Sequence, residues 1–249
     1  MKLKKGITVG LCCVATIVSA QEVVTLGTFG FQKVDIPPAG GVNLVGFNFT
    51  SDQTLYLEDV FGTNQLTQGF LPSLADNIYV WNGSSYDTYF QKSDGNFYDV
   101  ANPSTQATTE IVSGMAMFLQ SPSGASATNA ITLSGSVLMT DSEQQINNNG
   151  LLTFSNPYPT PLDLNGTNVD WSEATQGFLP TLADNVYIWN PEKTGGPGYE
   201  SFFIKTDGKW YESDSPSTLG NAVLPAGGGA FYDAKNTFTN EIIRPFPAD

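Results

Sequence analysis

The 249-residue chain contains no histidine, one arginine and two cysteines. The lack of histidine removes the commonest general base, the usual zinc ligand and every Ser-His-Asp triad. Both cysteines, Cys12 and Cys13, lie in an N-terminal segment that we predict is removed. The mature chain is then expected to lack disulfides, thiolate metal ligands and a cysteine nucleophile. Since no catalytic motif is recognisable either, the sequence predicts a protein that is not an enzyme and has no catalytic residues.

Basic residues are scarce, with 10 Lys and Arg against 24 Asp and Glu and a net charge of −14. Lys2, Lys4 and Lys5 fall in the removed segment, which leaves 7 basic and 24 acidic residues and a net charge of −17. Such a surface repels phosphate backbones, so nucleic acid is not an expected partner. It suits a soluble protein in a salty medium, where screening reduces self-repulsion, and it also suits binding of divalent cations.

Long hydrophobic runs are missing except near the N-terminus. A basic start, Met1 to Lys5, precedes an apolar run over residues 7–18, and the small residues Ser19-Ala20 come before Gln21. This pattern is typical of a cleaved signal peptide, here residues 1–20. The run is shorter than the ~20 residues that a membrane helix needs. We therefore predict a secreted protein, extracellular, periplasmic or at the cell surface, with no membrane span in the mature chain.

One segment occurs twice. Residues 67–82 read TQGFLPSLADNIYVWN and residues 175–190 read TQGFLPTLADNVYIWN, identical at 13 of 16 positions. Identity at this level indicates an internal duplication. Matches extend outward from both copies, which predicts one repeat unit over residues 21–130 and a second over residues 131–249. We expect two homologous domains that pack about a pseudo-twofold axis.

Within each unit the duplicated block predicts strands. In the first unit, strands are expected at residues 78–81, 86–92 and 97–100, because β-branched and aromatic residues dominate there and Asn-Gly and Asp-Gly turns separate them. Short helical turns are expected at residues 57–61 and 170–173. Short strands with closely spaced turn signals predict an all-β fold of two tandem sandwich or barrel-like domains.

Aromatic residues crowd these strands. Because successive residues of a strand face opposite sides, Ile78 and Val80 share one face and the aromatic residues between and after them share the other. Exposed on a sheet, such aromatics are typical of sugar or protein recognition, and packed together they fill an interface between units. On the first interpretation the ligand-binding residues are Tyr79, Trp81, Tyr187 and Trp189.

Acidic and amide residues gather beside the predicted turns. Hard cations prefer clusters of oxygen ligands, so calcium is the one cofactor that the sequence suggests. Ordinary turn chemistry is the competing explanation, because Asp and Asn are favoured before strands and in hairpin turns. The candidate calcium ligands are Asp76, Asn77, Asp94, Asp184, Asn185 and Asp207.

Four motifs stand out: an NLVG-like stretch at residues 43–48, an NPYP-like stretch at residues 155–159, the repeated Ala-Asp-Asn blocks and the Pro-Ala-Gly-Gly-Gly-Ala-Phe segment at residues 225–231. Together they resemble a class of uncharacterised secreted or cell-surface bacterial β-repeat proteins. The resemblance covers most of both units. It implies no activity, and the first unit departs from it in having Phe49-Thr50 after Asn48.

These observations predict a non-enzymatic, secreted or cell-surface structural or interaction protein, whose partner is a protein or glycan at the cell surface. Two alternatives stay open. One is a lectin-like carbohydrate-binding module, and the other is a glycan hydrolase that uses a pair of carboxylates.

Overall fold

The computed structural model describes residues 28–148 and 150–246, so the predicted signal peptide and its two cysteines lie outside the described residues. The described part consists almost entirely of antiparallel strands, which confirms the all-β prediction. Its helical elements are α1 (Leu57–Phe61), η1 (Pro72–Leu74) and η2 (Pro180–Leu182). Residues 170–173, predicted as a helical turn, lie in a non-helical turn.

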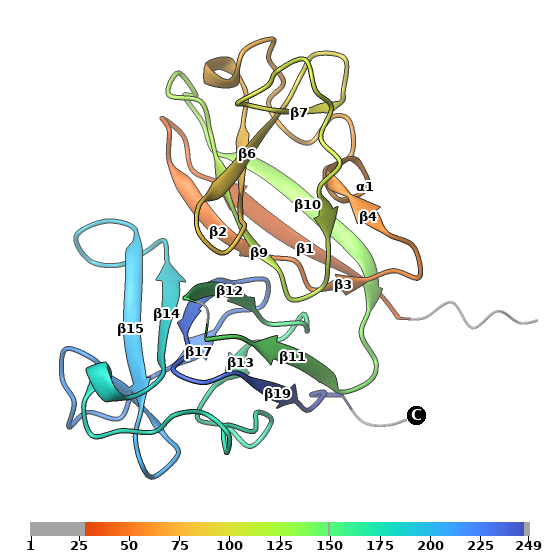
Figure 1. The fold of residues 1–249 in the computed structure, drawn as a ribbon. Helices are drawn as coiled ribbons and strands as arrows, with labels where there is room; N and C mark the ends of the chain where they lie inside the picture. The colour runs from red at the N-terminus through yellow and green to blue at the C-terminus, as the bar shows by residue number, and fades with distance from the viewer. Residues whose placement is uncertain (1–27, 149, 247–249) are drawn as a thin grey trace, which may run out of the picture.

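Two five-stranded sheets form the framework (Figure 1). The first has the order β2-β9-β5-β6-β7, with bounds Val42–Gly46, Ala116–Gln120, Asn77–Trp81, Tyr86–Gln91 and Phe97–Asp99. The second has the order β12-β18-β14-β15-β16, with bounds Leu151–Ser155, Gly229–Asp233, Asn185–Asn190, Gly198–Ile204 and Trp210–Glu212. The two copies of the duplicated segment supply β5 and β14, and each of these is the central strand of its sheet.

Smaller sheets complete each half. In the first half, β10 (Asn129–Val137) pairs with β1 (Phe29–Ile36) and β3 (Phe49–Thr50), and β4 (Leu55–Tyr56) pairs with β8 (Glu110–Ile111). In the second half, β11 (Ser142–Ile146) pairs with β19 (Phe238–Ile242), and β13 (Leu162–Asp163) pairs with β17 (Val223–Leu224). All these sheets are open, so no barrel closes within the described residues.

Each half has its own apolar core. Ile78 and Val80 of β5 face the first core, and Val186 and Ile188 of β14 face the second. This follows from the alternation of side chains along a strand. The predicted unit boundary at 130/131 falls inside β10, whose Ile131 and later apolar residues belong to the first core. The two halves therefore meet after β10.

A third apolar cluster joins the halves. Phe118 of β9 packs there with Trp189 and Phe231 of the second sheet. Backbone also crosses the join, where the Gly46 amide donates to the Gly227 carbonyl at 2.9 Å. Figure 1 shows the first half, red to green, above the second half, green to blue.

Glycine permits the close approach of the two sheets. A Cβ atom on Gly46 would lie 2.5 Å from the Cβ of Ser155, and one on Gly229 would lie 2.6 Å from the Cγ of Leu44. Both distances are shorter than nonbonded carbon atoms tolerate.

Among the described residues, no helix is long and apolar enough to span a membrane.

Candidate functional site

The four aromatic residues predicted to bind a ligand lie at the join between the halves. Trp81 donates from Nε1 to the Leu151 carbonyl at 2.7 Å and packs edge-on against Phe231, with ring centroids 5.9 Å apart. Tyr79 is partly buried against the same cluster. The aromatic face of β5 therefore packs against the second half of the molecule.

The corresponding residues of β14 pack in the same way with one difference. Trp189 lies edge-on to Phe118 at 5.3 Å and to Tyr199 at 5.2 Å, and it is 8% exposed. Tyr187 is partly buried beside it. The Trp189 Nε1 atom is buried without a hydrogen-bond partner, unlike its counterpart in Trp81.

Asp76 and Asp184, two predicted calcium ligands, are buried and close a loop in each half. Asp76 accepts from the Thr67 amide at 2.7 Å through Oδ2, and its own amide donates to the Thr67 carbonyl at 2.9 Å. Asp184 makes the same pair of bonds with Thr175, at 3.1 and 2.8 Å. Each carboxylate thus ties the start of a loop to its end, at residues 67–76 and 175–184.

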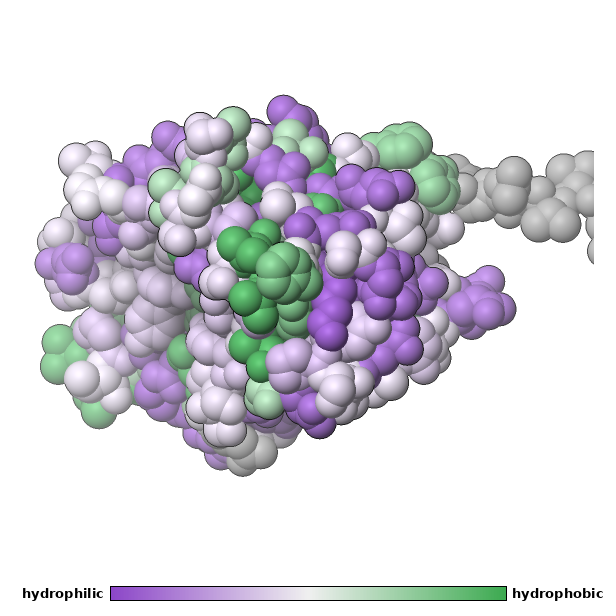
Figure 2. Space-filling view, turned by 90° about the horizontal axis from the view of Figure 1, so that it is seen from above, coloured by the Kyte–Doolittle hydropathy of each residue, from purple (hydrophilic) through white to green (hydrophobic). Residues whose placement is uncertain are grey.

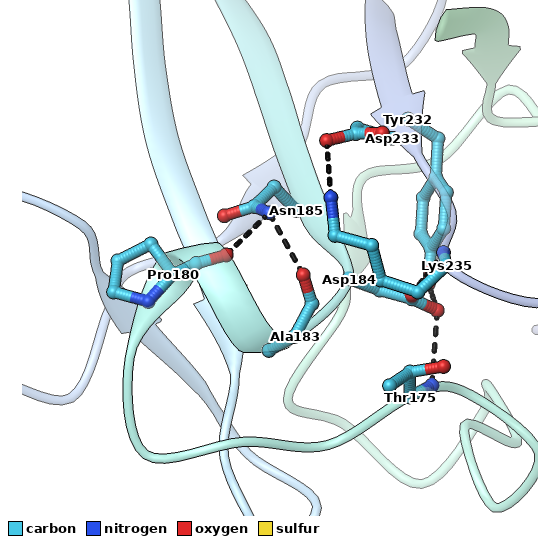
Figure 3. A network of polar contacts seen from close by, with 8 residues as sticks. All are labelled: Thr175, Pro180, Ala183, Asp184, Asn185, Tyr232, Asp233 and Lys235. Atoms are coloured by element: carbon cyan, nitrogen blue, oxygen red, sulfur yellow. Dashed lines mark hydrogen bonds and ion pairs between the residues drawn. The ribbon is translucent and has the colours of Figure 1, made fainter. Parts of the chain in front are cut away.

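Asn77 and Asn185 fix the crests of these loops, by which we mean the short helices η1 and η2. Asn185 donates from Nδ2 to the carbonyls of Pro180 and Ala183, both at 2.9 Å (Figure 3). Asn77 makes the equivalent bonds to Pro72 and Ala75, at 3.1 and 3.2 Å. These amides hold η2 and η1 in place. The sequence placed both residues among the candidate calcium ligands, whereas the structure gives their amide groups this local task.

Asp94 and Asp207, the remaining candidates, are exposed in hairpin turns. Asp94 accepts from the Asn96 amide at 3.0 Å and from the Tyr98 hydroxyl at 2.8 Å. These bonds, the backbone one first, lower the pKa of the Asp94 carboxyl. Asp207 accepts equivalent bonds from Lys209 and Tyr211. Within the described part of the chain, no three His, Cys, Asp or Glu side chains gather as metal ligands.

The loop crests expose large apolar side chains that sequence reasoning missed. We call Phe70, Leu71 and Leu74 the first knob; they are 70%, 49% and 49% exposed. The second knob is Phe178, Leu179 and Leu182, at 75%, 53% and 62%. The available signal was the Phe-Leu-Pro-x-Leu motif inside the duplicated segment. It gave no sign of exposure, because a run of apolar residues ordinarily indicates burial.

The two loops that carry the knobs are uncharged, although the chain as a whole is acidic. Residues 67–75 and 175–183 contain no charged side chain. Figure 2, which looks down on the end of the molecule that carries η1, shows apolar side chains gathered in a compact patch among polar ones. Figure 1 shows η1 in gold and η2 in turquoise on separate halves. Each knob exposes on the order of 300 Å² of apolar surface.

Two clefts flank the join. The first, which we call the Trp189 cleft, has a volume of about 300 Å³ and lies between β1, β2 and the segment Pro225–Gly228. The second has a volume of about 310 Å³ and lies between β11, β12 and residues 112–115. The duplication matches these walls to each other, so the clefts are a related pair. Each takes one wall from either half.

Comparison with protein-family models, with curated proteins and with solved structures gives no match.

Proposed function

We propose that the chain is a secreted, non-catalytic interaction protein that binds another protein through its two knobs. The observation that carries this proposal is that both copies of the loop expose the same Phe-Leu-Pro-x-Leu motif. The signal-like residues 1–20 support secretion.

The pattern of change between the two copies supports a binding role. Two of the three differences in the duplicated segment fall on buried positions, Ile78 against Val186 and Val80 against Ile188. The third difference, Ser73 against Thr181, falls on the exposed x position of the motif, whereas the exposed phenylalanine and both exposed leucines are unchanged. Packing constrains buried side chains, whereas an exposed phenylalanine has no core to fill. Folding alone gives no reason for the identity of the knobs, and contact with a partner gives one.

The knobs are also held ready for contact. The paired bonds of Asp76 and Asp184 close the loops, and the amides of Asn77 and Asn185 fix their crests. Ordering a loop before binding lowers the entropy lost on association. A rigid apolar protrusion is the form that an anchor residue takes at a protein interface.

The partner that fits is a protein with a concave apolar groove. A stable interface buries about 800 Å² per partner, which exceeds the exposed apolar area of one knob. Two knobs pressed together would thus make only a small contact between copies of this chain. A groove adds the area of its walls to the contact. Because the knob loops carry no charge, the affinity should depend only weakly on salt.

Site-specific photo-crosslinking in the producing cells tests the proposal. A benzophenone amino acid is placed at position 70, at position 178 or, as a control, at the equally exposed position of Phe31. We expect one protein to cross-link from both knobs and not from position 31. When purified, that protein should bind the wild type and lose about tenfold in affinity with the double variant Phe70→Ser, Phe178→Ser.

Phe31→Ser should leave that affinity unchanged. The proposal is overturned if the knobs cross-link only to a second copy of the chain or to lipid, or if position 31 captures the same protein. It also fails if the purified partner binds the double variant as well as it binds the wild type.

A further inference from the structure

We propose that the Trp189 cleft binds a neutral, hydroxyl-rich ligand, such as one sugar residue of a glycan. The site is distinct from the knobs and lies at the join between the two halves. The proposal rests on a difference between two residues that the duplication makes equivalent.

Trp81 and Trp189 occupy the same position in β5 and β14. The Trp81 indole N–H closes the join by donating to the Leu151 carbonyl at 2.7 Å. The duplication matches Leu151 to Asn43, which lines the Trp189 cleft. Trp189 makes no such bond, although 92% of its surface is buried. The indole N–H that is hydrogen-bonded in Trp81 is thus without a partner in Trp189, which lines a cleft.

An unused acceptor lies in the wall of the same cleft. Gln32 donates from Nε2 to the Gly227 carbonyl at 3.2 Å, while its Oε1 atom is buried without a partner. A buried polar group without a partner has lost its bonds to water and gained none in return. A hydroxyl group both accepts from an indole N–H and donates to an amide oxygen. The two groups in this cleft wall therefore favour a ligand that carries hydroxyl groups.

A ligand can reach these atoms only if side chains in the cleft wall move. Both atoms are shielded from bulk water, and Gln32 is only half-buried. Its amide must turn for the oxygen to face a ligand in the cleft, whose walls are partly apolar. Pro191, Pro225 and Leu44 form part of those walls. Such surfaces suit the C–H faces of a sugar ring.

Size and charge narrow the ligand class. A volume of about 300 Å³ lies at the lower end for ligand sites, which fits one sugar residue better than a longer segment. Lys33 is the one cation in the cleft wall and pairs with Asp35 at 3.4 Å, while Glu192 adds a second carboxylate. Anionic sugars are therefore disfavoured, and neutral ones fit.

A glycan array probed with the full mature chain, with and without calcium, tests the proposal. We expect binding to neutral glycans that does not need calcium. Titration calorimetry with the best-bound glycan should then show a loss of about tenfold in affinity for Trp189→Phe, which removes the N–H and keeps an aromatic ring. The matched control, Trp81→Phe, removes the equivalent N–H from the sealed side and should stay within about twofold of the wild type.

Gln32→Met provides a second test if Trp189→Phe does not fold. It keeps the length of the side chain, removes the acceptor and should also weaken binding by about tenfold. The proposal is overturned if no neutral glycan binds, if only sulfated or sialylated glycans bind, or if Trp81→Phe weakens binding as much as Trp189→Phe. The knob variants do not touch this cleft, so the two proposals fail or stand separately.

Discussion

Asp76 and Asp184 occupy equivalent positions in the two copies, but their carboxylates have different hydrogen-bond partners. Asp184 accepts from the Lys235 amide at 2.7 Å through Oδ1, and from the Thr175 amide and the Tyr232 hydroxyl through Oδ2 (Figure 3). Asp76 uses only Oδ2, which accepts from Thr67 and Asn129, and its Oδ1 is buried without a partner. In the first half, the positions of Tyr232 and Lys235 hold Leu119 and Pro122. Neither can donate such a bond.

Replacing each aspartate with asparagine should therefore change the stability of the protein differently in the two halves. In Asp184→Asn the new amide faces the donating Lys235 N–H, so we expect a loss of about 1–3 kcal/mol in the free energy of unfolding. In Asp76→Asn the amide can replace the oxygen that has no donor, so we expect a neutral or stabilising effect. Urea unfolding of the two variants measures this. Equal losses in both would contradict the assigned bonds.

The Asp184 carboxyl also predicts a pH dependence. Burial, as the largest cause, raises the pKa of Asp184 above its ordinary value, although the bonds from Lys235, Thr175 and Tyr232 oppose the shift. A raised folded-state pKa means that the folded protein favours the protonated acid. The contribution of Asp184 to stability is thus full below its unfolded-state pKa of about 3.9 and is lost as pH rises through its folded-state pKa. The stability difference between the wild type and Asp184→Asn should grow as pH falls from 7 to 4, and a constant difference would count against this assignment.

At the scale of elements, the hairpins could be predicted from the residues of their turns. The knobs could not be predicted, because an apolar run gives no sign that it is exposed. Strands were expected at residues 78–81 and 86–92 and are found at Asn77–Trp81 and Tyr86–Gln91. Gly83 and Gly95, in the turns, have φ of 98° and 87°, a conformation that favours glycine. Nothing in a Phe-Leu-Pro-x-Leu run shows that it faces solvent. That depends on the Asp-Asn pair after it, whose side chains turn back into the loop.

The amides of Asn77 and Asn185 should be needed for the shape of the knobs. Asn77→Ala or Asn185→Ala removes two bonds to loop carbonyls, so we expect a loss of about 1–2 kcal/mol and faster amide hydrogen exchange across the loop concerned. Ser73→Ala, on an exposed residue of the same loop, is the control and should change neither quantity. Hydrogen exchange read by mass spectrometry tests this. Unchanged exchange in the Asn77 variant would show that the crest is held by other contacts.

At the scale of the whole molecule, the sequence showed the duplication but left open which faces meet. The aromatic faces of β5 and β14 could have been exposed or packed together, and strand alternation alone does not decide between these arrangements. The join depends on tertiary contacts between residues far apart in the chain, such as Gly46 with Gly227. The predicted boundary at 130/131 missed the end of the first half for a similar reason. The pairing of β10 with β1, across about a hundred residues, assigns it to the first core.

The glycines of the join predict a matched pair of variants. In Gly229→Ala the added methyl group would lie 2.6 Å from Leu44 Cγ and 2.9 Å from Ala116 Cβ, so the two sheets must move apart. Overpacking of this kind costs about 1–3 kcal/mol. Gly124→Ala has open space around its new Cβ and should be neutral. Thermal unfolding of both variants measures the difference, and a Gly229→Ala protein as stable as Gly124→Ala would place the close contact in doubt.

Each cleft is formed by one wall from each half, and this has an evolutionary consequence. Two separate copies of an ancestral unit, paired in the same way, would have carried two identical clefts, since any mutation would have appeared in both. Fusion into one polypeptide removes that constraint. The Trp81 N–H can then be bonded to the Leu151 carbonyl while the Trp189 N–H stays without a partner beside its cleft. A doubled chain can thereby specialise one of its two clefts without giving up the architecture that both halves share.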